Sequence, residues 1–175
     1  MKKFKEFPDF CLTFKPCDLT NSGILVIADA SLGNVTRRGN VGEDPFARVC
    51  SQSAYYGLVA DEKEMKGEQG NFAVLDARSH RISRMCRSTF AAELYSTEEA
   101  LGVGTYCRGA LAELQGKNIK GRMIEAVLET IPMIVVTESK DCYDKGTSDT
   151  PSLGSQKSLC FSIAWMRTQL AKERT

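Results

Sequence analysis

The chain has 175 residues, of which 42% are hydrophobic and 26% are charged, and its formal net charge is +1. This length and composition fit one globular domain with a buried core and exclude a disordered chain. Its apolar runs are about strand length, far short of the roughly 20 residues of a membrane span, and the N-terminus has no apolar signal region. We therefore expect an intracellular protein, cytoplasmic or nuclear, with no membrane partner. The balanced charge neither indicates nor excludes nucleic acid.

The first half of the chain reads as an entry segment followed by strands. Residues 1–22 have mixed charge and no clear period, and the domain proper is predicted over residues 23–172. A near-continuous apolar run predicts a strand with both faces buried at 23–31. Turn residues then predict a long surface loop at 32–51. Two further strands are expected at 52–61 and from Phe72 onward, separated by a polar turn at 62–71, and the spacing favours an antiparallel meander.

The second half is mainly helical around one further strand. Ser88 is a good N-cap for a helix that runs to about Leu114, and Gly102 and Gly104 within it suggest close packing against the sheet. A short helix at 123–130, a fourth strand at 132–137 and a short turn or helix from Asp141 follow. The last element is an amphipathic helix at 156–172, with its apolar face formed by Leu159, Ile163, Met166 and Leu170.

The seven cysteines include no C-x-x-C pair, and His80 is the single histidine. A zinc site needs closely spaced ligand pairs, so none is predicted. Reduced thiols, several of them buried as small hydrophobes, are the expected state.

Three acids occupy the ends of predicted elements. Asp29 closes the first strand, Glu93 lies in the first turns of the long helix, and Glu138 closes the fourth strand. Together they suggest a divalent-metal site, because hydrolysis of a phosphodiester by two metals needs carboxylates that bridge and flank the ions. The alternative is that each is a solvated loop residue or cap. Nearby Asp141, Asp144 and Asp149 are read as surface turn residues, or as partial substitutes for a missing ligand.

Arginines fill the stretch between Asp76 and Glu93, which contains no acid. In this spacing they are predicted to grip a phosphate backbone beside the metal site, and the alternative is a solvated strand end and turn. The residues in question are Arg78, Arg81, Arg84 and Arg87.

These residues carry a family resemblance over roughly residues 20–170. The chain resembles the ribonuclease H domain of copia-type LTR retrotransposon Pol polyproteins. The likeness lies in Ile27–Ser31, in the S-T-x-x-A-E motif of Arg87–Leu94, in Val136–Lys140 and, more loosely, in Lys157–Leu170.

The resemblance implies an α/β fold with a mixed sheet of order 3-2-1-4, three antiparallel strands and then a parallel one, flanked by helices. It further implies Mg²⁺-dependent cleavage, with Mn²⁺ as a substitute, of the RNA strand of RNA–DNA hybrids, in a parent polyprotein that also carries a reverse transcriptase. By this likeness Asp29 is shared between two ions, Glu93 lies on the scissile-phosphate side and Glu138 holds the ion of the attacking water.

The chain departs from the family at two of its four acids, whose usual order is Asp, Glu, Asp, Asp. The third is Glu138, one methylene longer, and the fourth position holds Ser162, a neutral hydroxyl. The family's fifth strand is not evident either. Two hypotheses follow: a weak metal-dependent ribonuclease H, or a non-catalytic relic that binds nucleic acid without turnover. A phosphotransferase on the same type of sheet is disfavoured because the chain has no G-x-x-x-x-G-K-[ST] loop.

Overall fold

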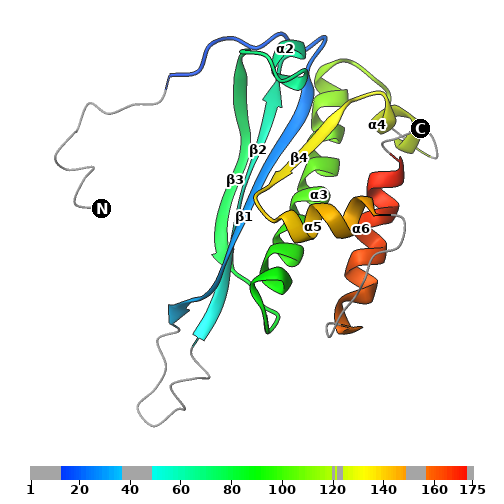
Figure 1. Cartoon of the computed structure of the whole chain (residues 1–175). Coiled ribbons are helices and arrows are strands. Elements are labelled where there is room, and N and C mark those ends of the chain that lie inside the picture. The colour runs from blue at the N-terminus through cyan, green and yellow to red at the C-terminus, as the bar shows by residue number, and fades with distance from the viewer. Residues whose placement is uncertain (1–12, 37–48, 120, 122–123, 149–156, 173–175) are drawn as a thin grey trace, which may run out of the picture.

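The protein forms a four-stranded mixed sheet with its long helices packed on one face (Figure 1). In this computed structural model the sheet order is β3-β2-β1-β4. Strands β1 (Gly23–Thr36), β2 (Val49–Ala60) and β3 (Phe72–Arg81) are antiparallel neighbours, and β4 (Met133–Thr137) runs parallel to β1. This confirms the predicted fold class, and the described residues contain no fifth strand. The structure describes residues 13–36, 49–119, 121, 124–148 and 157–172.

The first two strands are longer than predicted, so the loop placed at residues 32–51 is wrong at both ends. β1 continues to Thr36 and β2 begins at Val49. The register of the pair shifts between Ser31 and Val35, and Gly33 has a φ of 62°. Because glycine adopts this left-handed conformation without steric cost, a residue that signals a turn instead forms a bulge inside a strand. The middle of the predicted loop lies outside the described residues.

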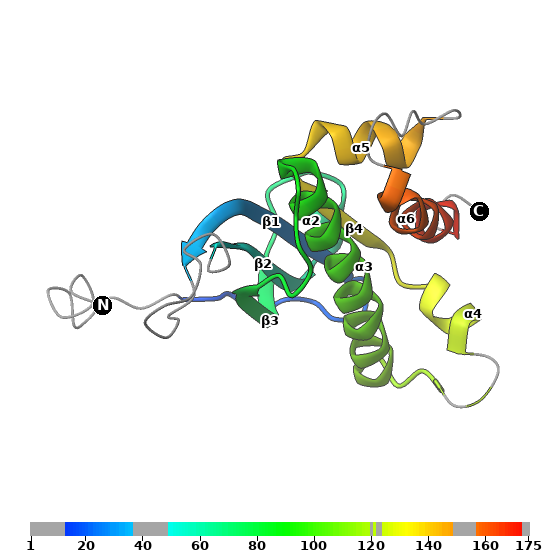
Figure 2. The same cartoon turned by 90° about the horizontal axis from the view of Figure 1, so that it is seen from below.

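The prediction that both faces of the first strand are buried is also wrong. Ile24, Val26 and Ala28 face the helices and are buried, whereas Ile27 on the other face is 40% exposed. Its neighbours across the sheet, Tyr56 and Val136, are exposed as well. Within the described residues, the helices therefore cover one face of the sheet, as the view from below shows (Figure 2).

A short helix, α2 (Glu62–Met65), stands where a plain polar turn was predicted. The Asp61 carboxylate organises it, because one oxygen accepts from the amide of Glu64 at 3.0 Å and the other from the amide of Asn71 at 2.8 Å. One side chain thus caps the helix and closes the turn between β2 and β3.

The long helix α3 (Thr89–Leu114) lies against the sheet and provides most of the core opposite β1 and β2. The hydroxyl of Ser88 accepts a hydrogen bond from the amide of Ala91 at 3.1 Å, as the N-cap prediction required. Gly104 is buried, and a Cβ added there would collide with Met133 Sδ of β4, whereas Gly102 has nothing within 4 Å. Close packing therefore explains Gly104 alone.

The remaining helices flank α3 and β4. They are α4 (Ile124–Glu129), α5 (Lys140–Thr147) and α6 (Cys160–Lys172), the last preceded by a single 3-10 turn at Lys157–Leu159. The predicted apolar face of α6 is confirmed: Leu159, Ile163 and Met166 are buried in a cluster with Phe90 and Leu94 of α3. At the far end of α3, Tyr106 and Leu114 are exposed, although both stand at apolar positions with helical spacing.

Two thiols belong to the hydrophobic core, as the cysteine pattern suggested. Cys107 lies in the cluster between α3 and the sheet, and Cys142 lies in the cluster between α3, α5 and α6. Burial raises the pKa of both thiols, which keeps them protonated. Among the described helices, none has the length and hydropathy needed to span a bilayer.

Candidate metal centre

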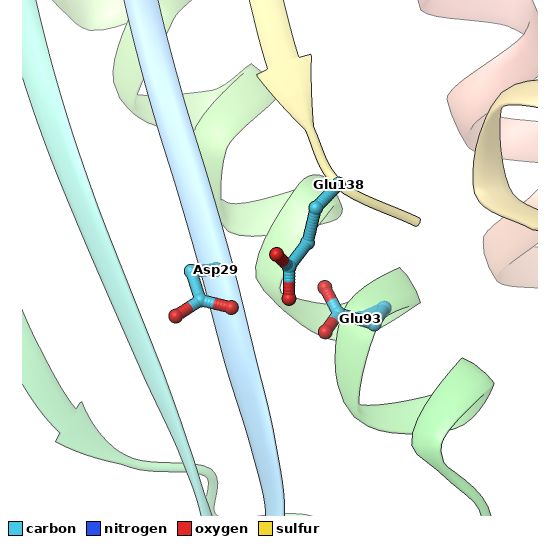
Figure 3. A group of neighbouring side chains, drawn as sticks. All are labelled: Asp29, Glu93 and Glu138. Carbon is cyan, nitrogen blue, oxygen red and sulfur yellow. The ribbon is translucent and has the colours of Figure 1, made fainter. Parts of the chain in front are cut away.

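The three predicted acids lie together. Asp29, Glu93 and Glu138 each offer a carboxylate oxygen, and these oxygens all lie within 4.8 Å of one another. Figure 3 shows the side chains converging from β1, from α3 and from the residue that follows β4. Asp29 and Glu138 are exposed and Glu93 is buried. The site is therefore open to solvent on one side and closed by α3 on the other.

The ends of two parallel strands place Asp29 and Glu138. The last residue pair between β1 and β4 is Ala28 with Thr137. Asp29 and Glu138 are the next residue on each strand, so both side chains extend beyond the last pair on the same exposed face. This is the carboxyl end of parallel strands, where ligands bind in open α/β sheets.

Glu93 approaches through the gap that the end of β4 leaves beside β1. The amide of Ile24 donates to the carbonyl of Pro132, on the β4 side, at 2.9 Å. Because strand amides alternate in direction, the amide of Ala30 also points to this side, beyond the end of β4. The Glu93 carboxylate accepts its hydrogen bond. A side chain of α3 thus takes the place of a missing strand.

The electrostatic state of Glu93 is unusual. It is 5% exposed, and its Oε2 atom is buried with no hydrogen-bond partner among the described residues. Burial, followed by the negative charges of Asp29 and Glu138, raises its pKa from 4.5 to about 7, although the Ala30 amide acts in the opposite direction. Three carboxylates this close repel one another when ionised, and a cation would relieve the repulsion.

The donor set fits a hard divalent cation. Mg²⁺ and Mn²⁺ prefer carboxylate oxygens, and Mg²⁺ usually retains several waters beside one or two protein carboxylates. The Oε2 atom of Glu93, which has no hydrogen-bond partner among the described residues, could accept a bond from a cation. Asp29, Glu93 and Glu138 are the residues that would hold the ion.

Within the described residues, no further acid joins this group. Asp141 and Asp144 are exposed on α5, and neither belongs to the cluster. Asp149 lies outside the described residues. Ser162 is half-buried on α6, which packs against α3 and α5. The site thus comprises three carboxylates, and the position assigned to a fourth by resemblance holds a hydroxyl.

The four arginines do not share one face. Arg81 lies in the row Ser31–Gln52–Arg81, on the same side of the sheet as Asp29, whereas Arg78 lies in the row Ala28–Tyr55–Arg78, on the helix side. Arg84 lies over the ring of Tyr95 at 4.9 Å and 3.6 Å from Glu98. Arg81 and Arg84 both line a hollow of about 390 Å³. Arg87 is exposed just before α3.

Sequence reasoning missed a group of buried polar residues beside the centre. Ser96 Oγ donates to the carbonyl of Asp29 at 2.9 Å, and it lies 2.9 Å from Ser53 Oγ. Ser53 in turn donates to Glu99, which also pairs with His80 at 3.2 Å. The sequence held only a weak indication of this group, namely that Ser53 and Ser96 are polar residues at positions where the strand and helix patterns predict apolar ones.

Comparison of the chain with models of known protein families, with curated proteins and with solved structures finds no match. The resemblance to copia-type ribonuclease H domains therefore rests on the short stretches around the three acids and, more loosely, on Lys157–Leu170. The sheet order and the convergence of the three acids are observations of this structure, made without reference to any known protein.

Proposed function

We propose that this chain is a ribonuclease H-type domain that binds Mg²⁺ or Mn²⁺ and hydrolyses the RNA strand of RNA–DNA hybrids. The observation that carries the proposal is the convergence of Asp29, Glu93 and Glu138 at the carboxyl ends of β1 and β4 in a 3-2-1-4 sheet. Acids at element ends are common, but a buried glutamate whose oxygen lacks a partner beside two other carboxylates is costly without a cation.

Each carboxylate has a distinct part in the proposed chemistry. A bound divalent ion supplies Lewis acidity and a water of lowered pKa. Asp29 and Glu138, both exposed, face the substrate side and would orient the ion and the scissile phosphate. Glu93 closes the site from α3, and its burial lowers the local dielectric, which strengthens electrostatic interactions at the reacting group.

The substrate is proposed to lie across the uncovered side of the sheet, where Asp29 and Arg81 both point. Binding of a phosphate backbone needs positively charged side chains along its path. Arg81 and Arg84 line one hollow, and Arg87 is exposed in the segment that precedes α3. Arg78, on the opposite side, is left out of this proposed contact. The parent polyprotein with a reverse transcriptase, and the intracellular setting, are parts of the same proposal.

A second candidate function is binding of nucleic acid without turnover. The observation in its favour is that α6 contributes no carboxylate to the cluster in the described residues and carries Ser162 where the resemblance places an acid. Glu138 also reaches one methylene further than aspartate, and a displacement of about 1 Å can cost on the order of a hundredfold in rate.

A cleavage assay distinguishes the two candidates. A labelled RNA–DNA hybrid is incubated with the protein in Mg²⁺ and then in Mn²⁺, with Asp29→Asn as the inactive variant and Glu113→Gln, at an exposed site near the end of α3, as the control. Cleavage of the RNA strand by the wild type and the control, lost in Asp29→Asn, supports the nuclease. A folded protein that binds the hybrid and leaves it intact supports the second candidate. In that case the double variant Ser162→Asp, Glu138→Asp is expected to gain activity.

A further inference from the structure

A chain of hydrogen-bonding groups runs from the surface to the backbone of Asp29. His80 Nε2 lies 3.2 Å from Glu99 Oε2, Ser53 Oγ lies 3.2 Å from the same oxygen, and Ser96 Oγ lies 2.9 Å from Ser53 Oγ and 2.9 Å from the carbonyl of Asp29. Both serines are 1% exposed. Buried hydroxyls between a helix and a sheet are costly unless each is hydrogen-bonded, so their partners matter.

The peptide group between Asp29 and Ala30 is held from α3 on both sides. Its carbonyl accepts from Ser96, and its amide donates to Glu93. Glu93 and Ser96 are three residues apart, so they project from neighbouring positions on one helix face. This peptide belongs to Asp29, one of the three residues that would hold a metal ion. Its position therefore sets where the Asp29 carboxylate lies.

The series from His80 to Asp29 has fewer hydroxyl protons than contacts that need one. Ser53 and Ser96 have one O–H each, and Glu99 as a carboxylate only accepts. Three contacts need a proton: Ser96 with Asp29, Ser53 with Ser96, and Ser53 with Glu99. A hydrogen bond to a charged acceptor is roughly twice as strong as a neutral one, so the Ser53 proton goes to Glu99. The Ser96 proton is then contested between Ser53 Oγ and the carbonyl of Asp29.

We propose that Ser96 is a positioning residue for the metal centre, and that Ser53 and Glu99 compete with Asp29 for its hydroxyl proton. When the proton points to Asp29, the strand end is fixed for metal binding; when it points to Ser53, the Asp29 carbonyl loses this contact with α3. This inference rests on the proposed function, because it assumes that Asp29 ligates a divalent cation.

The proposal gives opposite expectations for two buried serines in contact with each other. Ser96→Ala removes the contact with Asp29, and loss of such a supporting group costs about tenfold or more in metal affinity. Ser53→Ala removes the competitor, so its Mn²⁺ affinity is expected to equal or exceed that of the wild type. Glu99→Ala should behave like Ser53→Ala, because it removes the acceptor of the Ser53 proton and frees that proton for Ser96. A simple loss of packing would weaken Mn²⁺ binding in both serine variants.

Calorimetric titration with Mn²⁺ tests this, with Thr105→Ala as the control. The Thr105 hydroxyl donates to the Leu101 carbonyl within α3, away from the candidate metal centre. Weaker binding in Ser96→Ala but not in Ser53→Ala or the control supports the proposal. Equal affinity in Ser96→Ala, or equal losses in both serine variants, overturns it while leaving the metal site in place.

A readout without metal separates failure of the inference from failure of the proposed function. If the wild type binds no Mn²⁺, the metal site itself is refuted, and the hydrogen exchange of the Ala30 amide then decides the positioning role. Faster exchange at Ala30 in Ser96→Ala than in Ser53→Ala, with unchanged exchange in the core of α3, supports it. The same exchange rate at Ala30 in Ser96→Ala and in the wild type overturns it.

Discussion

Ala30 donates its amide hydrogen to the carboxylate of Glu93 at the point where β4 has ended. One side chain therefore does two things: it satisfies the backbone of the central strand, and it provides the buried member of the candidate metal centre. Because the hydrogen bond favours the ionised carboxylate and burial disfavours it, Glu93 is held between two opposed influences. Its protonation should be visible in both stability and metal affinity.

The first prediction concerns stability against pH. The pKa of Glu93 is about 7 in the folded protein and 4.5 ordinarily. Between these values the folded state binds more protons than the unfolded state, so stability falls as pH rises from about 4.5 to 7 and the cost is then constant. Glu93→Gln removes the cost. At pH 8 it should unfold with a free energy higher by up to about 3 kcal/mol, and at pH 4 nearly the same as wild type.

Urea unfolding at the two pH values, without divalent ions, measures this difference. Glu113→Gln, which removes a carboxylate at an exposed site on the same helix, is the matched control. If Glu93→Gln changes stability equally at pH 4 and pH 8, then ionisation of the buried carboxylate is not the cause.

The second prediction concerns metal affinity against pH. A cation must displace the proton of Glu93 below its pKa of about 7. Mn²⁺ affinity should therefore fall by about tenfold for each pH unit below 7 and level off above it, with release of a proton on binding. Calorimetry in two buffers of different ionisation enthalpy counts that proton. Asp29→Asn should abolish the heat of binding, and an affinity independent of pH would exclude Glu93 as a ligand.

The third prediction concerns two glycines of α3. Gly104→Ala adds a methyl group that meets Met133 Sδ, and overpacking of this kind typically costs about 1–3 kcal/mol. Gly102→Ala meets nothing within 4 Å and should add about 0.5–1 kcal/mol, because alanine is the better helix former. The two free energies of unfolding should change in opposite directions. A common sign would show that helix propensity, and not the contact with β4, governs both sites.

The fourth prediction concerns the nucleic-acid face. Arg81→Ala should weaken binding of an RNA–DNA hybrid and reduce the slope of log affinity against log salt by about one, because one phosphate contact is lost. Arg78→Ala is the control, since Arg78 lies three residues earlier on the same strand and faces the helix side. Fluorescence anisotropy at several salt concentrations measures both slopes. A larger loss in Arg78→Ala would place the substrate on the other side of the sheet.

Local sequence patterns were enough to predict the order of the strands and of the longer helices, and to single out the three acids. Two of these patterns are local in sequence: an apolar strand that ends in an acid, and an N-cap five residues before Glu93. Neither depends on contacts between distant residues. The apolar face of α6 was equally local, because its spacing follows the turn of the helix.

What could not be predicted depends on pairings distant in the sequence. The faces of Arg78 and Arg81 follow from the register of β3 on β2, which a strand pattern alone does not reveal. The exposure of Ile27 depends on whether helices cover one face of the sheet or both. The apolar run of β1 would be the same in both arrangements, so it could not reveal which one occurs. The contact of Ser53 with Ser96 joins residues 43 positions apart.

The close contact of Gly104 with Met133 has a consequence for the distant acids. From this contact α3 runs back eleven residues to Glu93, about 16 Å at 1.5 Å per residue. From Met133 the chain runs forward five residues to Glu138, a similar reach of about 17 Å along an extended strand. From the contact between Gly104 and Met133, helix α3 and strand β4 thus extend over similar distances, and each ends near one of the carboxylates. A methyl group added at Gly104 would meet Met133 Sδ and Val26 Cγ2, so we expect a substitution far from any carboxylate to alter the affinity of the candidate site for Mn²⁺.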